Sequence, residues 1–136
     1  MGTLSEALAG AHALWRYVVL ISAFIAIGNM LMGALDKRSW KASDTRIGRF
    51  FITALDLEVV LGVLLWLLQE RWDGVDVLRS WRHPALMLLA LVIAHYGWWR
   101  AARMPGDRSR FALLTMYFVI AGVVIVVGVL QIQGVF

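Results

Sequence analysis

Two of the three histidines in the chain stand at matching positions. His12 and His83 each lie at the first turn of a long apolar segment. These are the first and third of four such segments, so in an antiparallel bundle they run parallel and hold both imidazoles at one level. A haem iron with two imidazole ligands takes one nitrogen from each side of the porphyrin plane, and ligands inside bundles come from side chains on facing helices. The pair therefore predicts a bis-histidine haem site.

The sequence around these histidines supplies other parts of such a site. From His83 one helical face continues at steps of three and four residues, through Met87, Ala90, Ala94 and Gly97. Apart from Met87 these side chains are small, so they leave room for a porphyrin beside the ligand. Arginines near the same end of the segments are suited to pairing with haem propionates; they are Arg16, Arg79 and Arg82.

The histidines also have a purely structural interpretation. Pro84 directly follows His83, and proline favours the first position of a helix. His83 then lies at or near the helix cap, where its side chain has free backbone amides to bond instead of a metal. A zinc site is less favoured than haem, because the chain has no cysteine and no third ligand is evident at that depth.

A second group of polar side chains falls at another depth, in the inner half of the apolar segments. Its members come from all four segments and are Asn29, Asp56, Glu58, His95 and Tyr117. Ionisable groups inside a membrane are costly and usually face the bundle interior. One interpretation is a quinone or proton-transfer site, in which His or Tyr donates to a quinone carbonyl and a carboxylate accepts a proton. The alternative is an internal hydrogen-bond network. Asp56 and Glu58 are two residues apart, so only one of them can face His95.

Four apolar segments are long enough to hold these residues in a membrane. About 20 apolar residues cross the hydrocarbon core as a helix, and the segments cover roughly 11–35, 50–68, 84–102 and 111–135. Hydrophobic residues make up 61% of the 136 residues and charged residues only 16%, which is too apolar for a soluble protein. Strand alternation is absent, so a barrel is not expected. The prediction is an all-α membrane protein, a single domain over residues 1–136 that forms a four-transmembrane-helix up-down bundle.

The connections between the segments predict an orientation. Nine of the 13 basic residues fall in the first and third connections, namely Lys37, Arg38, Lys41, Arg46, Arg49, Arg100, Arg103, Arg108 and Arg110. The positive-inside rule places these connections in the cytoplasm and both termini on the outer side. Tryptophans near the segment ends are typical of interfacial anchors. Those near the outer end are Trp15, Trp66, Trp72 and Trp81, and those near the inner end are Trp40, Trp98 and Trp99.

Composition excludes several functions. Without cysteine the chain has no disulfide, no thiolate metal site and no covalent haem attachment. The net charge is +4, but the basic residues cluster between the apolar segments as topology signals, so nucleic acid is not an expected partner. No Ser-His-Asp arrangement, phosphate-binding loop or paired-carboxylate hydrolase pattern is present.

Three short stretches together resemble small four-helix bacterial membrane proteins of the b-type cytochrome kind. They are His12-Ala13-Leu14-Trp15-Arg16-Tyr17, the run from Asp56 to Gly62, and His83-Pro84-Ala85-Leu86-Met87. The resemblance implies a non-covalent haem b with His12 and His83 as its axial ligands. Larger members of this kind hold two haems and need four histidines. With three histidines, this chain has room for one bis-histidine haem.

The resulting hypothesis is a haem-b-binding electron-transfer protein of the bacterial inner membrane, with multiple spans, that exchanges electrons with quinol or with a redox protein. The alternatives are a non-redox accessory subunit of a larger membrane complex and a pigment-binding subunit that uses single histidines. A proton-coupled transporter that uses the inner polar layer ranks lower, because four short helices suit alternating access only as an oligomer. A homo-oligomer remains an open possibility for each of these.

Overall fold

The computed structural model describes residues 2–135, which are almost entirely helical. The four long helices are α1 (Gly2–Leu35), α2 (Ala42–Leu68), α3 (His83–Ala101) and α4 (Asp107–Ile132). Two short helices, η1 (Arg71–Asp73) and η2 (Leu78–Arg82), lie between α2 and α3. No strand occurs in the described part of the chain, so the all-α prediction is confirmed.

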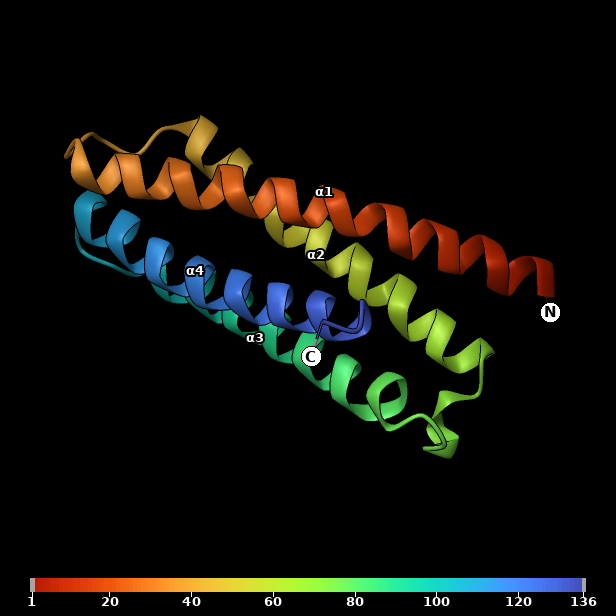
Figure 1. The fold of residues 1–136 in the computed structure, drawn as a ribbon. Coiled ribbons are helices and arrows are strands. Elements are labelled where there is room, and N and C mark those ends of the chain that lie inside the picture. The colour runs from red at the N-terminus through yellow and green to blue at the C-terminus, as the bar shows by residue number, and fades with distance from the viewer. Residues whose placement is uncertain (1, 136) are drawn as a thin grey trace.

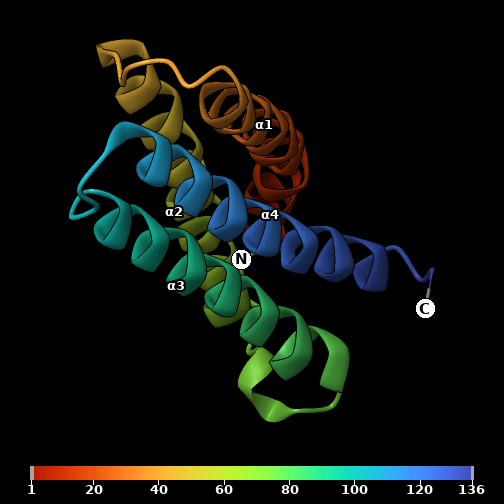
Figure 2. The same ribbon diagram turned by 90° about the vertical axis from the view of Figure 1, so that its left-hand side faces the viewer.

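The helices alternate in direction and form an up-down bundle, as predicted (Figure 1). Helix α1 packs against α2 and α4, and α3 packs against the same two helices. Helices α1 and α3 are therefore diagonal neighbours across the bundle, with α2 and α4 between them. Figure 2 shows α3 and α4 diverging toward the end of the bundle that holds the α2–α3 connection.

Three of the helices, α1, α2 and α4, are long and apolar enough to cross a membrane. Large apolar side chains on them face outward, among them Leu14 and Phe24, which are 72% and 80% exposed. Lipid is a suitable solvent for such an exterior, whereas water is not. Helix α3 has 19 residues and does not meet the same criterion. A fourth membrane span therefore remains a prediction.

Two helices begin earlier than the apolar segments predicted. Helix α1 begins at Gly2 rather than near Ala11, and α2 begins at Ala42 rather than near Phe50. Hydropathy detects only the apolar part of a helix, whereas the first turns of α2 are held by a polar cap. The carboxylate of Asp44 accepts the backbone N–H of Lys41 at 2.7 Å, which stabilises the helix start.

Asp44 is fully buried and joins α2 to α1 through other polar contacts. It accepts hydrogen bonds from two guanidinium nitrogens of Arg38, at 2.7 and 2.8 Å, and from the amide of Asn29 at 2.8 Å. A buried charge needs such partners, because leaving it unpaired costs several kcal/mol. The side-chain amide of Asn29 therefore already has a hydrogen-bond partner at this end of the bundle.

An aromatic cluster fills the bundle near the α1–α2 and α3–α4 connections. The Trp98 ring stacks on Phe118 with 6.4 Å between centroids and lies 6.3 Å from Trp40, which in turn lies 4.9 Å from Phe111. Trp98 was expected to be an interfacial anchor but is partly buried against the core. A Cβ added at Gly48 would overlap its ring, so the glycine on α2 admits Trp98 between the helices. At the opposite end, the Trp66 ring contacts Trp72 and Trp81.

A π-helical turn leads without a break into α3. It covers Leu78–Arg82, and the backbone N–H of His83 donates to the carbonyl of Leu78, five residues earlier. Pro84 has no N–H to offer the carbonyl of Ser80, four residues before it. That carbonyl instead accepts the indole N–H of Trp66 at 2.8 Å. The turn is thereby fixed to α2, and π turns inside helices are frequent at functional sites.

Candidate cofactor site

A cavity of about 320 Å³ opens between the four helices at the end that holds the α2–α3 connection. Its volume is at the lower end of the range of small-molecule sites, about 300–1,000 Å³. The wall is mostly apolar, with contributions from Val19, Leu55, Val59, Leu88, Ile125 and Val129. The polar groups in the wall are few, and both predicted ligand histidines are among them.

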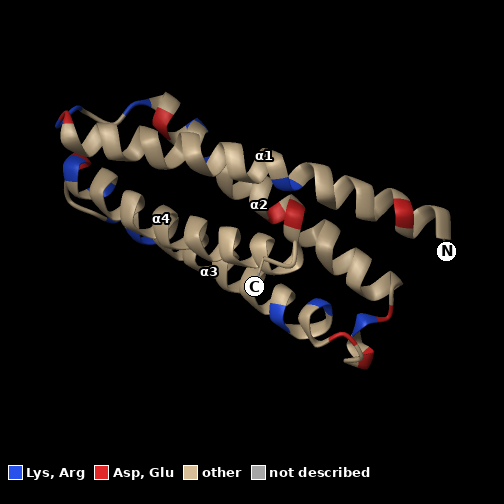
Figure 3. Cartoon of the chain, in the orientation of Figure 1, with Lys and Arg blue, Asp and Glu red and all other residues tan. Residues whose placement is uncertain are grey.

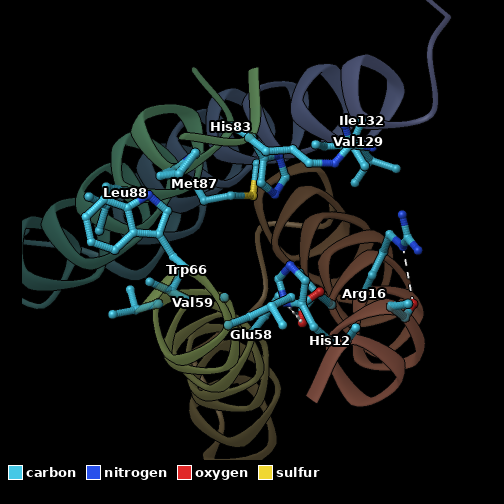
Figure 4. A pocket seen from close by; sticks show the side chains of 18 of the residues that line it. His12, Arg16, Glu58, Val59, Trp66, His83, Met87, Leu88, Val129 and Ile132 are labelled. Carbon is cyan, nitrogen blue, oxygen red and sulfur yellow. Dashed lines mark hydrogen bonds and ion pairs between the residues drawn. The ribbon is translucent and has the colours of Figure 1, made fainter. Parts of the chain in front are cut away.

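His12 and His83 enter this cavity from the diagonal helices α1 and α3 (Figure 4). Their ring centroids are 6.3 Å apart, and the ring planes make an angle of 80°. A metal–imidazole nitrogen bond is about 2.0 Å long. With about 1 Å more from each nitrogen to its ring centre, two imidazoles on opposite sides of one metal hold their centroids roughly 6 Å apart. The observed separation is of that size, and the two rings now meet edge to face.

A carboxylate lies against the His12 ring. Nδ1 of His12 lies 2.9 Å from Oε1 of Glu58 on α2, and the Glu58 side chain is only 8% exposed. With Nδ1 this close to the carboxylate, Nε2 is the nitrogen left for a metal. Metal-binding histidines usually have such a carboxylate or carbonyl partner, which fixes the ring orientation and raises the basicity of the ligand.

The position of Glu58 corrects its predicted membership of the inner polar layer. It lies in the cavity with His12, and the structure separates it from the inner polar layer. The sequence carried part of this signal, because the spacing between Asp56 and Glu58 allows only one of them to face His95. It did not show which one, since that depends on how α2 is rotated against α1.

His83 does not cap a helix. The π turn runs directly into α3, so His83 follows helical residues and has no free amides beside it. Its Nδ1 is buried beside the backbone of Gly128 and makes no hydrogen bond of good geometry within residues 2–135. The capping alternative is therefore wrong, and the ring is available to a ligand.

Two glycines and a methionine lie beside the two imidazole rings. A Cβ added at Gly62 would lie 3.1 Å from Cε1 of His12, and one added at Gly128 would lie 3.6 Å from Nδ1 of His83. Met87 lines the cavity beside His83, as Figure 4 shows. The face of α3 predicted from the sequence is confirmed, because Met87, Ala90, Ala94 and Gly97 are all buried.

Three arginines line the cavity, namely Arg16, Arg71 and Arg79. The carboxylate of Asp76 accepts a hydrogen bond from Arg79 at 2.9 Å and lies 4.0 Å from Arg71. The hydrogen bond from Arg79 is the main reason why the pKa of Asp76 is below its usual value.

The structure changes the set of arginines expected at this end. Arg82 was predicted to belong to the site, but it is exposed and does not line the cavity. It directly precedes His83, and neighbouring residues on a helix point in directions about 100° apart. Arg71 is a cavity residue that the sequence did not indicate, because it lies in a connection whose path depends on the short helix η1.

The predicted inner polar layer does not assemble into one site. His95 pairs with Asp56, with 2.6 Å between Nε2 and Oδ1. The hydroxyl of Tyr117 accepts a hydrogen bond from Arg100 at 3.0 Å, and Asn29 belongs to the Asp44 cap. The shared depth was a consequence of similar helix lengths, and the rotation of each helix gives its polar residue a separate partner.

In residues 2–135, no three His, Cys, Asp or Glu side chains are grouped so that they could hold a metal ion by themselves. Two imidazoles suffice for haem iron, because the porphyrin supplies the remaining ligands. The chemistry of the donor set and the separation of the rings therefore fit haem, whereas a bare metal ion would need further ligands.

Comparison of the chain with protein-family models, with curated proteins and with solved structures found no match. The resemblance to b-type cytochromes thus rests on the short stretches in the sequence alone.

Proposed function

We propose that this chain is an integral membrane electron-transfer protein that holds one haem b between His12 and His83. The observation that carries the proposal is the pairing of these two imidazoles across one cavity, with 6.3 Å between their centroids. Two histidines so far apart in sequence have no need to meet at this separation for packing alone. Haem bound there supplies reversible one-electron chemistry.

The residues around the histidines have separate tasks in this proposal. Glu58 fixes the orientation of His12 and raises its basicity. The apolar wall keeps water away from the iron, which together with ligand basicity sets the reduction potential. Arg16, Arg71 and Arg79 bind the propionate carboxylates, for which the planar guanidinium group is well suited.

The distribution of charge supports a location and an orientation. Lysines and arginines gather around the α1–α2 and α3–α4 connections (Figure 3). In a bacterial inner membrane this end faces the cytoplasm by the positive-inside rule. The cavity then lies toward the outer face, where a redox protein or a larger membrane complex is the partner that exchanges electrons with the haem.

The visible spectrum of the purified protein tests the proposal. A sharp α band on reduction with dithionite is expected for low-spin bis-histidine haem b. His12→Ala and His83→Ala should each abolish the low-spin spectrum, whereas His95→Ala, at a histidine outside the cavity, should preserve it. Full retention of low-spin haem in either of the first two variants contradicts the ligand assignment.

The same measurement separates the alternatives. A far-red band instead of a haem spectrum indicates a chlorin and a pigment-binding subunit. A protein that carries no chromophore after growth with added haem precursor, and that does not take up haem when purified, is an accessory subunit rather than a cytochrome.

A further inference from the structure

Asp56 and His95 form a polar pair that the cavity does not use. Oδ1 of Asp56 on α2 lies 2.6 Å from Nε2 of His95 on α3. Neither residue lines the cavity. The pair joins the two helices that are separated by the longest connection, residues 69–82, and it lies near the middle of α2 (Ala42–Leu68).

The pair is open to the exterior of the bundle. The side chains of His95 and Asp56 are 50% and 43% exposed. Neither has another hydrogen bond within residues 2–135, since each makes only the contact to the other. If α2 spans the membrane, these free polar atoms face hydrocarbon, where unsatisfied groups cost several kcal/mol.

The surface around the pair is largely apolar and partly aromatic, and the guanidinium of Arg103 lies 4.1 Å from the centre of the Trp99 ring. Val60 lies one turn beyond Asp56 on α2, and Val92 and Trp99 lie one turn to either side of His95 on α3. All three are more than half exposed, and the Trp99 ring lies 5.9 Å from that of Tyr96. A ligand that binds here therefore needs a small polar head for the pair and an apolar body for the flanking side chains, and it must reach the site through lipid.

The hydrogen-bonding capacity of the pair selects the kind of head. The second carboxylate oxygen of Asp56 remains as an acceptor, and Nδ1 of His95 is another in the tautomer that donates its Nε2–H to Asp56. Two neighbouring acceptors bind a hydroxyl group, which can donate, better than a carbonyl oxygen, which can only accept. Membrane-dissolved hydroquinones combine an aromatic ring, phenolic hydroxyls and an apolar tail.

We propose that the Asp56–His95 pair is the binding site for the head of a membrane quinol, on the lipid-facing side of the α2–α3 contact. One phenolic hydroxyl donates to the pair, and the ring lies along Val92 and the face of Trp99 that Arg103 does not cover. The proposal concerns binding alone and does not depend on haem in the cavity.

Photolabelling of the full-length protein in liposomes tests the site. The label is an azido-substituted short-chain quinone reduced to its quinol, the competitor is decylubiquinol, and the labelled peptides are identified by mass spectrometry. Label is expected within residues 53–60 of α2 and 92–99 of α3, and decylubiquinol should suppress it more strongly than decylubiquinone does. Label that maps elsewhere, or a quinone that competes better than the quinol, overturns the proposal.

Labelling of substituted chains provides a second test of the site. Loss of a hydrogen bond to a charged group corresponds to about tenfold weaker binding, so Asp56→Asn and His95→Gln should lower specific labelling by about that factor. Tyr117→Phe is the matched control, because its hydroxyl bonds Arg100 rather than the pair, and it should label normally.

The outcomes distinguish this site from the haem proposal. Labelling is detected by mass spectrometry and not by haem absorbance. A chain without haem therefore still reports on quinol binding. Equal labelling of all three variants overturns the assignment. Crosslinks between two copies of the chain across Val60 and Val92, with no label there, show instead that a second copy covers the pair. If a variant does not fold, the label map of the unaltered chain decides alone.

Discussion

At the scale of single residues, two carboxylates on one helix have different neighbours. Glu58 is buried against His12 in the cavity, whereas Asp56 is half exposed against His95. They are only two residues apart, so a rotation of α2 by part of a turn would exchange their surroundings. The difference between them provides a matched pair for mutagenesis.

Replacement of Glu58 should weaken haem binding without removing a ligand. In Glu58→Ala the Nδ1 of His12 loses its partner and the ring loses its fixed orientation, so haem affinity should fall about 10- to 100-fold. Glu58→Gln keeps an acceptor oxygen and should lose less. Haem titration of the apoprotein, followed by absorbance, measures both.

Asp56→Asn is the control for this prediction, because Asp56 lies on the same helix outside the cavity. It should bind haem as the unaltered chain does. An affinity of Glu58→Ala equal to that of Asp56→Asn would show that the carboxylate does not support the ligand.

Residue types predicted the candidate ligands but not the residues that contact those ligands. The positions of His12 and His83 at the starts of two parallel segments follow from counting along the chain. The contact between Glu58 and His12 follows from the rotation of α2 against α1, and the position of Arg71 follows from a short helix in a connection. Periodicity gives the buried face of a helix only where apolar and polar residues differ, and in α2 both faces are largely apolar.

At the scale of helices, close packing depends on a few glycines. A Cβ at Gly97 of α3 would overlap Cβ and Cγ of Tyr117 on α4, next to its backbone. A rigid atom of that kind cannot move aside as the end of a flexible side chain does. The α3–α4 contact is therefore set by the absence of a side chain at this position.

Gly97→Ala should lower stability by about 1–3 kcal/mol, as is usual for overpacking in a core. Gly28→Ala is its control, because no atom lies within 4 Å of an added Cβ there. The control should be neutral or slightly stabilising, since alanine is the better helix former. Thermal unfolding in detergent, followed by circular dichroism, compares them; equal midpoints for the two variants would disprove the packing argument.

The connection before α3 should respond to pH through Asp76. Its pKa is lowered by the hydrogen bond from Arg79, so the ion pair stabilises the fold above the unfolded value of about 4. That contribution is lost as the pH falls through the lower folded pKa. Asp76→Asn removes the charge but keeps an oxygen that can cap the helix.

The measurement is the difference in unfolding temperature between Asp76→Asn and the unaltered chain. Other carboxylates titrate in both proteins and cancel. The unaltered chain should be the more stable one near neutral pH, and the difference should vanish in acid. A difference that is constant with pH would mean that the pair contributes nothing.

At the scale of the whole molecule, fold class and helix directions could be predicted, but the internal assembly could not. Four apolar segments with short connections leave few arrangements besides an up-down bundle. The extension of α1 back to Gly2 and the polar start of α2 were missed, because polar turns such as the one capped by Asp44 carry no hydropathy signal. The prediction that the inner polar residues form a single site was wrong. The depth of a residue follows from its position along its own helix, whereas a contact also depends on how two helices are rotated against each other.

The predicted orientation has its own test. Reporter fusions placed in the α1–α2 connection after Arg38 and near the C-terminus after Gly134 should report opposite sides of the membrane. Green fluorescent protein should fluoresce only in the first fusion, and alkaline phosphatase should be active only in the second. The reverse result would mean that the protein has the opposite membrane topology, with the cavity near the cytoplasmic face.

The diagonal placement of α1 and α3 has a consequence for how the site can change in evolution. The two helices do not pack on each other, so the gap between His12 and His83 is fixed by the spacer helices α2 and α4. Each spacer carries a glycine beside one ring, Gly62 at His12 and Gly128 at His83. A methyl group gained at Gly62 would lie 3.1 Å from the His12 ring and press on it, whereas one gained at Gly128 would first displace the end of the Met87 side chain beside His83. Related chains can thus diverge in the spacing of the two rings at positions that a search for histidines alone would miss.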